Sequence, residues 1–374
     1  MGAFTGARLL SGMTRAWTQG AGAASRYLLL ASALACVCAL GACAADPTPT
    51  PTPPYGLPPL RLPADEAPHD FLTEWWYFSL HVEAESGARF PLHHVLFQVR
   101  EPNSGRTLYV AQASVADAAT GAHAQGERLR IEAAPLPASG DGFAFEAGDW
   151  EMSGGAGEYR LRGGAGEYAF DLSLTGGGAP LLHGEDGLVD FGAAGVSYYY
   201  TRTRLDVAGE LSTPSGVEAV SGTGWFDKQW GDFQPVAVRW DWTGVQLDDG
   251  RDLMLSRLFH GDGRPIAIYG TLGSPERGAV RLDADEFRFE PTPGAEWRSA
   301  DTGAVYETEW RVSVPGEGID VMLRPLVEGA EFRSRALGVI YWEAGVDAVA
   351  PDGRTVGRGF VELTGRAGLS AAPP

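Results

Sequence analysis

The feature that most limits how this chain can fold is a series of short segments in which residues alternate with period two. The segment at 74–81 shows it most clearly, with Glu74, Trp76, Phe78 and Leu80 on one strand face and Trp75, Tyr77, Ser79 and His81 on the other. Similar segments recur towards the C-terminal end, separated by Gly, Asp and Asn. This alternation predicts an all-β protein built as a sandwich or a barrel, and even spacing of antiparallel strands favours barrels. Only the stretch 328–337 suggests a short helix.

One order of elements occurs twice along the chain. An aromatic strand, an acidic turn and an apolar strand follow one another at 74–99 and again at 240–258, where the turn is Asp248-Asp249-Gly250. A chain of 374 residues is long enough for two domains, each with its own core. We therefore predict two similar β modules, an N-terminal one at 68–214 and a C-terminal one at 215–368.

The N-terminal residues have the pattern of an export signal. Arg8, Arg15 and Arg26 accompany an uncharged run at 27–40, which is short for a bilayer span of about 20 residues. The sequence Leu40-Gly41-Ala42-Cys43 resembles a bacterial lipobox, in which the cysteine is acylated. We predict a lipoprotein signal peptide at 1–42, then the lipidated Cys43 and a Pro/Thr-rich linker to residue 67, extended where proline alternates. A plain signal peptide and an uncleaved anchor are the alternatives.

Charge and cysteine content narrow the expected partners and location. The formal net charge of −19 argues against binding to nucleic acid. All three cysteines lie at or before Cys43, so the mature body has none to pair. We expect the protein to be exported and held by its lipid anchor in the bacterial cell envelope. The absence of Asp after Cys43 favours the outer membrane, facing the periplasm.

Four motifs become informative when they are taken together. They are Glu74-Trp75-Trp76-Tyr77, the segment 224–231 (GWFDKQWG), Trp240-Asp241-Trp242, and the segment 359–365 (GFVELTG). In this order they resemble the AttH/CrtC family of lipocalin-like proteins, which includes bacterial carotenoid 1,2-hydratases (hydroxyneurosporene synthases) and many exported proteins described as secreted hydrolases. The resemblance covers about residues 68–366. It implies two lipocalin-like antiparallel β-barrel domains packed together, an apolar ligand and no cofactor.

The sequence departs from the hydratases of that family at two places. Adding water to an isolated C=C bond requires a protonated carboxylic acid, aromatic faces for the cation and a positioned water. Lys228 stands where the family often has His, and Leu255-Ser256-Arg257 stands where the hydratases carry Tyr-x-Asp. Arginine does not release its proton at neutral pH, so Arg257 argues against carotenoid hydratase activity in this chain.

The candidate site residues surround the tryptophan-rich motifs. The catalytic candidates are Asp227, Lys228 and Glu74, with Lys228, the single lysine of the chain, as cation or proton source. The candidates for ligand binding are Trp76, Tyr77, Tyr199, Trp225, Trp230, Trp240 and Trp242. The alternative for the catalytic residues is structural, with Asp227 capping a turn, Lys228 facing solvent and Glu74 at a barrel rim.

Other polar residues are interpreted as structural. We expect Asp241 to pair with an arginine and Glu362 to hold a hydrogen bond at a strand end. His93 and His94 are adjacent in a strand, so they project to opposite faces and do not chelate one metal together. The other histidines are scattered, and no metal site is predicted.

These observations leave three functions open. The first is an exported lipoprotein whose hollow barrels bind an apolar isoprenoid or fatty-acyl ligand, as a carrier or processing protein. The second is a cofactor-free hydratase or hydrolase acting on that ligand, and the third is an envelope scaffold without a ligand. No nucleophile elbow, Walker A loop or dinucleotide fingerprint supports conventional serine hydrolysis or nucleotide chemistry. Ligand identity and oligomeric state stay open.

Overall fold

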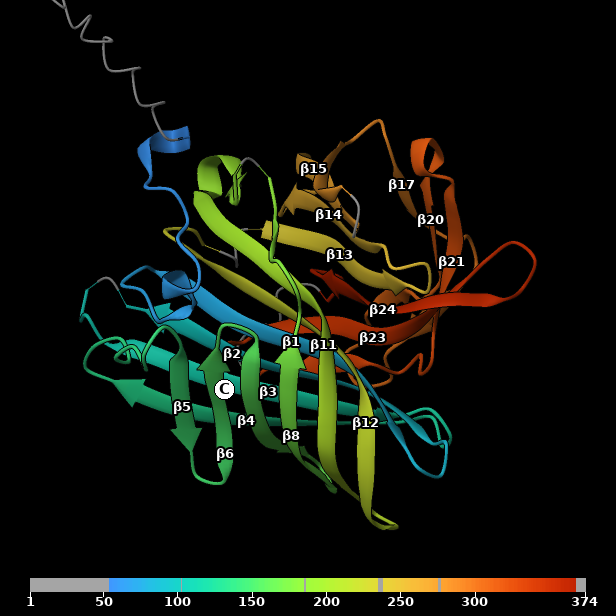
Figure 1. Ribbon diagram of the computed structural model, residues 1–374, viewed down its shortest axis with the longest axis horizontal. Coiled ribbons are helices and arrows are strands. Elements are labelled where there is room, and N and C mark those ends of the chain that lie inside the picture. The colour runs from blue at the N-terminus through green and yellow to red at the C-terminus, as the bar shows by residue number, and fades with distance from the viewer. Residues whose placement is uncertain (1–53, 102, 185, 235–237, 275–276, 368–374) are drawn as a thin grey trace, which may run out of the picture. The chain divides into compact units, whose positions relative to one another are not determined.

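The computed structural model describes residues 54–101, 103–184, 186–234, 238–274 and 277–367. The predicted signal peptide, the lipidation site Cys43 and most of the proline-rich spacer lie outside these ranges. Throughout the described residues the chain forms β-strands and short 3₁₀ turns, with no α-helix, so the predicted all-β class is confirmed (Figure 1). No described helical segment is long and apolar enough to cross a bilayer.

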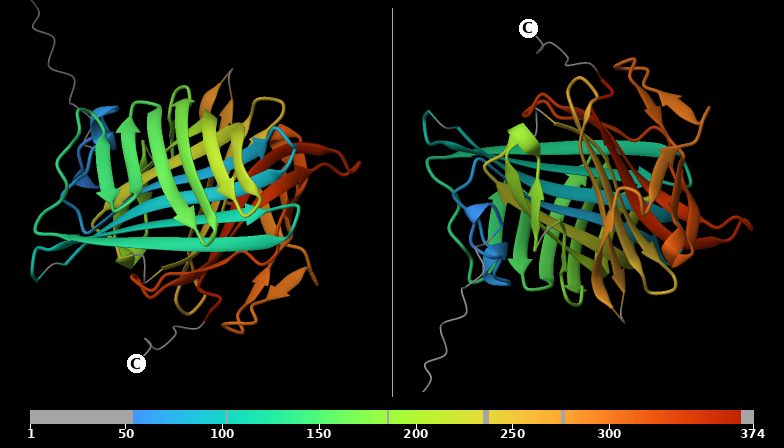
Figure 2. Two further views of the ribbon diagram at one scale, coloured as in Figure 1. Left: turned by 90° about the horizontal axis from the view of Figure 1, so that it is seen from below. Right: turned by 90° about the horizontal axis from the view of Figure 1, so that it is seen from above.

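The first sheet has twelve strands in the order β4-β3-β2-β1-β12-β11-β8-β7-β6-β5, with β9 and β10 against β11. The strands are β1 (Thr73–Ala84), β2 (Arg89–Arg100), β3 (Thr107–Asp117), β4 (Ala122–Glu132), β5 (Phe143–Ala147), β6 (Trp150–Gly155), β7 (Glu158–Ala165), β8 (Tyr168–Gly176), β9 (Leu181–Leu182), β10 (Leu188–Asp190), β11 (Val196–Thr213) and β12 (Gly216–Gly231). The sheet curls so that β5–β8 cross over β1–β4 and form a nearly closed barrel (Figure 2).

The second sheet has ten strands in the order β16-β15-β14-β13-β24-β23-β21-β20-β17, with β22 against β23. The strands are β13 (Val238–Leu247), β14 (Asp252–His260), β15 (Pro265–Ser274), β16 (Gly278–Asp283), β17 (Arg288–Pro291), β20 (Trp310–Val314), β21 (Ile319–Pro325), β22 (Glu331–Arg333), β23 (Ile340–Val349) and β24 (Thr355–Thr364). A separate hairpin joins β18 (Glu296–Arg298) to β19 (Val305–Glu307). The predicted pair of antiparallel barrels is therefore confirmed.

The two sheets repeat one topology. In each sheet, four strands form a meander that starts at an aromatic strand, which is β1 in the first sheet and β13 in the second. The last strand of the sheet then returns to pair with that first strand, so β12 pairs with β1 and β24 pairs with β13. This is the repeat that the sequence pattern at 74–99 and 240–258 indicated. The sheets divide after Gly231, whereas the predicted boundary at 214/215 falls in the turn between β11 and β12. Strand β12 joins the first sheet because it pairs along its length with both β1 and β11.

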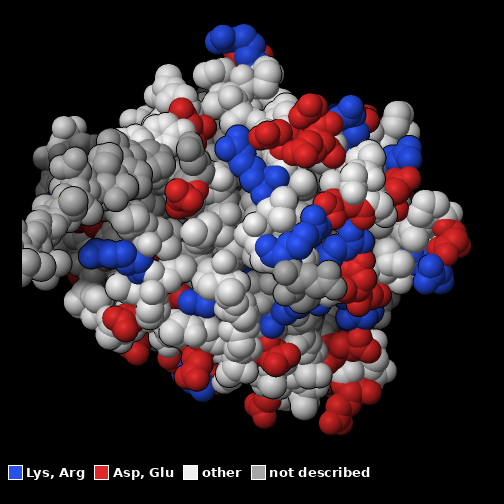
Figure 3. Space-filling view, turned by 45° about the horizontal axis from the view of Figure 1, so that its top comes forward, with Lys and Arg blue, Asp and Glu red and all other residues white. Residues whose placement is uncertain are grey.

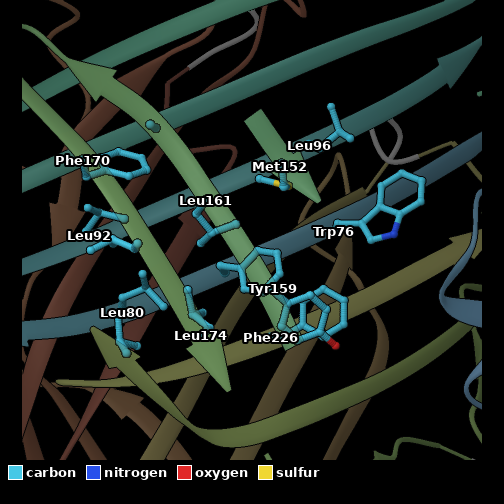
Figure 4. Packing of buried hydrophobic residues seen from close by; sticks show 14 of the residues in the cluster. Trp76, Leu80, Leu92, Leu96, Met152, Tyr159, Leu161, Phe170, Leu174 and Phe226 are labelled. Atoms are coloured by element: carbon cyan, nitrogen blue, oxygen red, sulfur yellow. The ribbon is translucent and has the colours of Figure 1, made fainter. Parts of the chain in front are cut away.

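The interior of the first barrel is filled by its own side chains. Trp76 and Leu80 point inward from β1 and pack with residues from β2, β6, β7, β8 and β12 (Figure 4). Phe78 belongs to the same cluster and stacks on Phe226. Trp76 and Phe78 are fully buried. Small barrels fill in this way because every second residue of each strand projects into a narrow interior.

The second barrel is packed in the same way around Trp310, Trp342, Tyr306 and Leu323, which are at most 1% exposed. Both interiors therefore differ from the sequence-based expectation of a hollow barrel that shelters a ligand. A third cluster of buried apolar residues lies between the two sheets, and it includes Tyr77, Tyr199 and Trp242.

Two segments differ from the sequence interpretation. The short helix suggested at 328–337 is wrong, because residues 331–333 form β22, which pairs with β23 while Phe332 stacks on Tyr341 at 5.1 Å between ring centroids. The described part of the predicted linker packs on the first barrel through Leu57, Leu60 and Leu62. Within it, the carboxylate of Glu66 is fully buried and accepts hydrogen bonds from Arg202 and Tyr159.

The charged side chains at the surface form mixed groups. On the face shown in Figure 3, acidic and basic residues alternate in small clusters. Several are local pairs, such as Arg277 with Glu317 and Arg311 with Asp320. Exposed pairs of this kind contribute little to stability, so the fold depends mainly on its buried clusters.

Candidate functional site

A partly open cleft of about 80 Å³ lies where the outer faces of the two sheets meet. Strands β1, β2, β11 and β12 line it from the first sheet, and β13, β14, β15, β23 and β24 line it from the second. Aromatic rings form much of its wall, among them Trp75, Tyr77, Phe97, Tyr199, Trp240 and Trp242. The volume matches two or three water molecules at about 30 Å³ each, so any larger molecule would have to extend towards the open side.

Strand alternation decides which residues reach the cleft. On β1, Trp75 and Tyr77 face it, whereas the intervening Trp76 faces the barrel core. On β12, Asp227 and Gln229 face it. The cleft is therefore lined by the strand faces that point away from the barrel interiors.

Three carboxyl groups from three strands line this aromatic cleft. They are Asp227 on β12, Glu343 on β23 and Glu362 on β24. Asp227 is 4% exposed and Glu343 is 3% exposed. Burial removes water from the charged form of a carboxyl group, so it favours the protonated form.

Of these three carboxyl groups, Asp227 has the most hydrogen-bond donors. The Tyr199 hydroxyl donates to Oδ2 at 2.7 Å, and the Trp225 indole N–H donates to Oδ1 at 2.7 Å. The Thr201 hydroxyl donates to Oδ1 as well. Burial raises the pKa of Asp227 to about 7, although all three hydrogen bonds favour the ionised form and lower this pKa.

The environments of the two glutamates also favour the protonated form. Burial raises the pKa of Glu343 well above its usual range, the neighbouring charges of Glu362 and Asp227 add to this, and only the hydrogen bond from Tyr77 opposes it. Burial, together with the charge of Asp227, raises the pKa of Glu362 to about 7, against a hydrogen bond from Trp240. We infer that Asp227 ionises first, because it has the most donors, and that its charge keeps a proton on Glu343.

A buried polar group stands beside Glu343. Nδ1 of His93 is 3.3 Å from Glu343 Oε2 and 2.8 Å from the Ser114 hydroxyl. The Tyr341 hydroxyl donates to Gln112 Oε1 at 2.9 Å. Burial lowers the pKa of His93 well below its usual value, so this imidazole is neutral and its contact with Glu343 is not an ion pair.

The structure separates the three predicted catalytic residues. Asp227 faces the cleft, whereas Lys228 and Glu74 lie on the opposite face of the sheet, inside the first barrel, because neighbouring residues in a strand point in opposite directions. Lys228 Nζ donates to Glu74 and lies 3.8 Å from the ring centroid of Trp76. Burial lowers the pKa of Lys228 to about 8, against the charge of Glu74. This pair is fully buried rather than solvent-facing or at a rim.

The predicted aromatic residues divide in the same way. Tyr77, Tyr199, Trp240 and Trp242 line the cleft, whereas Trp76 and Trp230 belong to the core of the first barrel. Trp225 lies next to the cleft, where its ring packs edge-on against Trp242 at 6.1 Å.

Gly244 makes this ring contact possible. A Cβ atom at that position would lie 2.8 Å from the Trp242 ring and 3.0 Å from the Trp225 ring.

Glu343 is a cleft carboxyl group that the sequence interpretation did not select, and Glu362, interpreted as structural, also lines the cleft. The alternation Tyr341-Trp342-Glu343 places Tyr341 and Glu343 on one face, but that pattern does not show what the face meets. Tyr269 and Ser256 were missed for the same reason, and both line the cleft.

The interpretations of Asp241 and of the adjacent pair His93 and His94 are confirmed. Asp241 pairs with an arginine, Arg366. His93 and His94 do project to opposite faces, His93 towards Tyr341 and His94 towards Trp150 in the first barrel. Arg257 donates to the carbonyl oxygen of Phe289 at 2.9 Å, away from the cleft that Ser256 lines. Among the described residues no group of three or more His, Cys, Asp or Glu is placed to hold a metal ion.

Comparisons with known proteins agree with this architecture. The family model described as AttH-like matches residues 52–366. A crystal structure of a candidate AttH from Nitrosomonas europaea matches with a TM-score of 0.72 and 29% identity, covering 83% of this chain and 98% of that one. Kievitone hydratase from Nectria haematococca matches with a TM-score of 0.64 and 14% identity, covering 83% and 94%, a likeness of fold alone. No curated protein sequence matches significantly.

Proposed function

Since the chain belongs to the AttH-like family, as its motifs suggested, we propose that it is a cofactor-independent acid–base enzyme that adds water to, or removes it from, an apolar unsaturated molecule. The substrate would bind in the cleft between the two sheets, against the aromatic wall.

The convergence of Asp227, Glu343 and Glu362 in an aromatic cleft carries this proposal. A protein that only carries an apolar molecule needs the rings but gains nothing from buried carboxyl groups, whose burial works against folding unless they are paired. Carboxyl groups with raised pKa values in a cleft are typical of general acids and bases. The arrangement therefore favours an enzyme over a carrier.

The environments of the carboxyl groups assign their roles. Glu343, which keeps its proton at neutral pH, donates it to one carbon of the substrate C=C bond. Water adds to the neighbouring carbon through its oxygen, and Asp227 accepts the proton that this water loses. The sum is one water added across the double bond, and proton exchange with solvent resets both groups. The rings of Trp240 and Trp242 face the cleft, where their π-electrons stabilise the intermediate carbocation.

The hydratase among the structural neighbours suggests this reaction class but does not carry it over, because 14% identity supports the fold alone. The observation particular to this chain is the set of carboxyl groups. The apolar substrate class that the sequence predicted, isoprenoid or fatty-acyl, remains the proposal, restricted to unsaturated members.

The test is conversion in oxygen-18-labelled water. Purified full-length protein is extracted to identify any co-purifying apolar molecule by mass spectrometry, and this molecule and a panel of unsaturated isoprenoids and fatty acids are then incubated with the protein. We expect a product heavier by one labelled water. Glu343→Gln and Asp227→Asn should each lower the rate by about 10²–10⁴-fold.

Glu331→Gln is the matched control. Glu331 is a buried carboxyl group of the second barrel, bonded to Ser299, Thr302 and Tyr306 outside the cleft, so its replacement should leave the rate unchanged. A molecule that binds but keeps its mass with the wild type and every variant would overturn the enzyme proposal and favour the carrier. Equal rates for the wild type and Glu343→Gln would refute the acid role.

The cellular setting rests on the sequence. We propose that the protein is exported and anchored in the cell envelope through acylated Cys43, with the outer membrane as its site. Cys43→Ser should abolish acylation and release the protein from the membrane fraction. An unchanged mobility and an unchanged membrane fraction would contradict the anchor.

A further inference from the structure

A buried histidine, His183, is connected to Asp227 through the Thr201 hydroxyl and does not itself line the cleft. His183 follows β9 and is fully buried. Its Nε2 atom is 2.6 Å from the Thr201 hydroxyl oxygen on β11, and its Nδ1 atom is 2.8 Å from the Thr271 hydroxyl oxygen on β15. The Thr201 hydroxyl donates to Asp227 Oδ1. Three hydrogen bonds therefore run in series from the second sheet to the cleft carboxyl group.

The direction of each hydrogen bond follows from counting protons. A threonine hydroxyl has one proton, and Thr201 gives it to Asp227, so its oxygen must accept from His183 Nε2–H. Burial lowers the pKa of His183 to about 3, so the ring is neutral and has one N–H group. Nδ1 is then an acceptor and receives the proton of Thr271. Every proton in the series points towards Asp227.

We infer that His183 is a positioning residue for Asp227, which it serves by donating to Thr201 and thereby directing the threonine proton onto the carboxylate. An oxygen that accepts a hydrogen bond becomes a better donor, and buried networks strengthen this effect. The series therefore favours the ionised form of Asp227. This inference deepens the proposed function, in which Asp227 is the base, and rests on it for its catalytic meaning.

Other ionisable groups also lie close to Asp227 and His183 and influence the pKa of Asp227. Asp227 is faced by Tyr199 from β11, Tyr269 from β15, Glu343 from β23 and Glu362 from β24. The Tyr199 ring lies 4.2 Å from the His183 ring and itself donates to Asp227. These groups are the same in the variants below, so differences between variants report on the series through His183.

The test is nuclear magnetic resonance of the full-length protein, which requires no substrate. The ¹⁵N shifts of the His183 ring, assigned with His183→Gln, should show the Nε2–H tautomer at pH 8. The pKa of Asp227 is read from its ¹³Cγ shift, assigned with Asp227→Asn. Thr201→Val, which removes the donor but keeps the shape, should raise that pKa by about one unit.

Two changes at residue 183 separate positioning from packing. His183→Phe keeps a ring but has no donor, and should raise the pKa of Asp227 in the same direction by less than Thr201→Val. His183→Gln places an N–H near the position of Nε2 and should keep the wild-type value.

The Nδ1–H tautomer in the wild type would overturn the inference, as would an unchanged pKa of Asp227 in a folded His183→Phe protein. The tautomer measurement decides alone if that variant does not fold. Neither result depends on whether the protein is an enzyme, so failure here and failure of the proposed function are distinct.

Discussion

Replacing Asp227 by Asn should make the stability of the protein less sensitive to high pH. The buried carboxyl group has a pKa of about 7 in the folded protein against an ordinary value of 3.8. Folding therefore favours the protonated form, so the stability that this group contributes is complete below pH 4 and is lost as the pH rises to about 7.

The expected magnitude follows from that difference. A rise of roughly three pKa units corresponds to about 4 kcal/mol at 1.36 kcal/mol per unit. The difference in free energy of unfolding, variant minus wild type, should therefore increase by about 4 kcal/mol between pH 4 and pH 8. At pH 4 the variant should be the less stable protein, because an amide does not accept hydrogen bonds from Thr201, Tyr199 and Trp225 at once.

The assay is urea denaturation followed by tryptophan fluorescence at half-unit steps of pH. Histidines that titrate in this range are shared by both proteins and cancel in the difference. Asp206→Asn, which removes an exposed carboxyl group from β11, supplies the baseline for losing one charge. A difference between the Asp227 variant and wild type that stays constant with pH would refute the raised pKa of this buried carboxyl group.

Two further changes test the first barrel, both by urea denaturation. Lys228→Met should destabilise the protein by about 3–5 kcal/mol, because it leaves the carboxylate of Glu74 buried without its main partner. The double variant Lys228→Met, Glu74→Gln should recover most of that loss. Equal losses in the single and the double variant would contradict the pairing. His94→Phe should stabilise by about 1 kcal/mol at pH 7, since neither ring nitrogen of His94 has a hydrogen-bond partner among the described residues. Burial lowers the pKa of His94 to about 3, so the wild type loses stability as the pH falls below 6.5. The stability advantage of His94→Phe should therefore be larger at pH 4 than at pH 7. An advantage that does not grow would refute the lowered pKa of His94.

Much of the candidate site follows from residue parity along single strands. Alternation at 74–81 correctly divided β1 into a face with Trp76 and Phe78 and a face with Trp75 and Tyr77. The same rule predicts that Asp227 and Lys228 point in opposite directions, so these two catalytic candidates do not share one site. Parity assigns residues to faces but does not say which face meets a core and which meets a second sheet.

The boundary between the modules shows why linear order is insufficient. Residues 217–227 precede the second aromatic strand in the sequence, which suggested that they begin the second module. In the structure they belong to β12, where Gly231 lies opposite Thr73 and Val220 lies opposite Ala84. Pairing between segments so far apart in the sequence depends on how well the two complete strands match in register and in buried faces. A local sequence pattern does not carry that information.

The sequence by itself determined the all-β class, the twofold repeat and the family, because period-two alternation, turn residues and the four motifs are all local sequence patterns. Only the tertiary structure decided that both barrels are packed, that Lys228 is enclosed with Glu74, and that Asp227, Glu343 and Glu362 share one cleft. The physical reason is that burial and electrostatic coupling depend on which distant strand faces come together, and that contact shifts the pKa values on which the proposed chemistry depends.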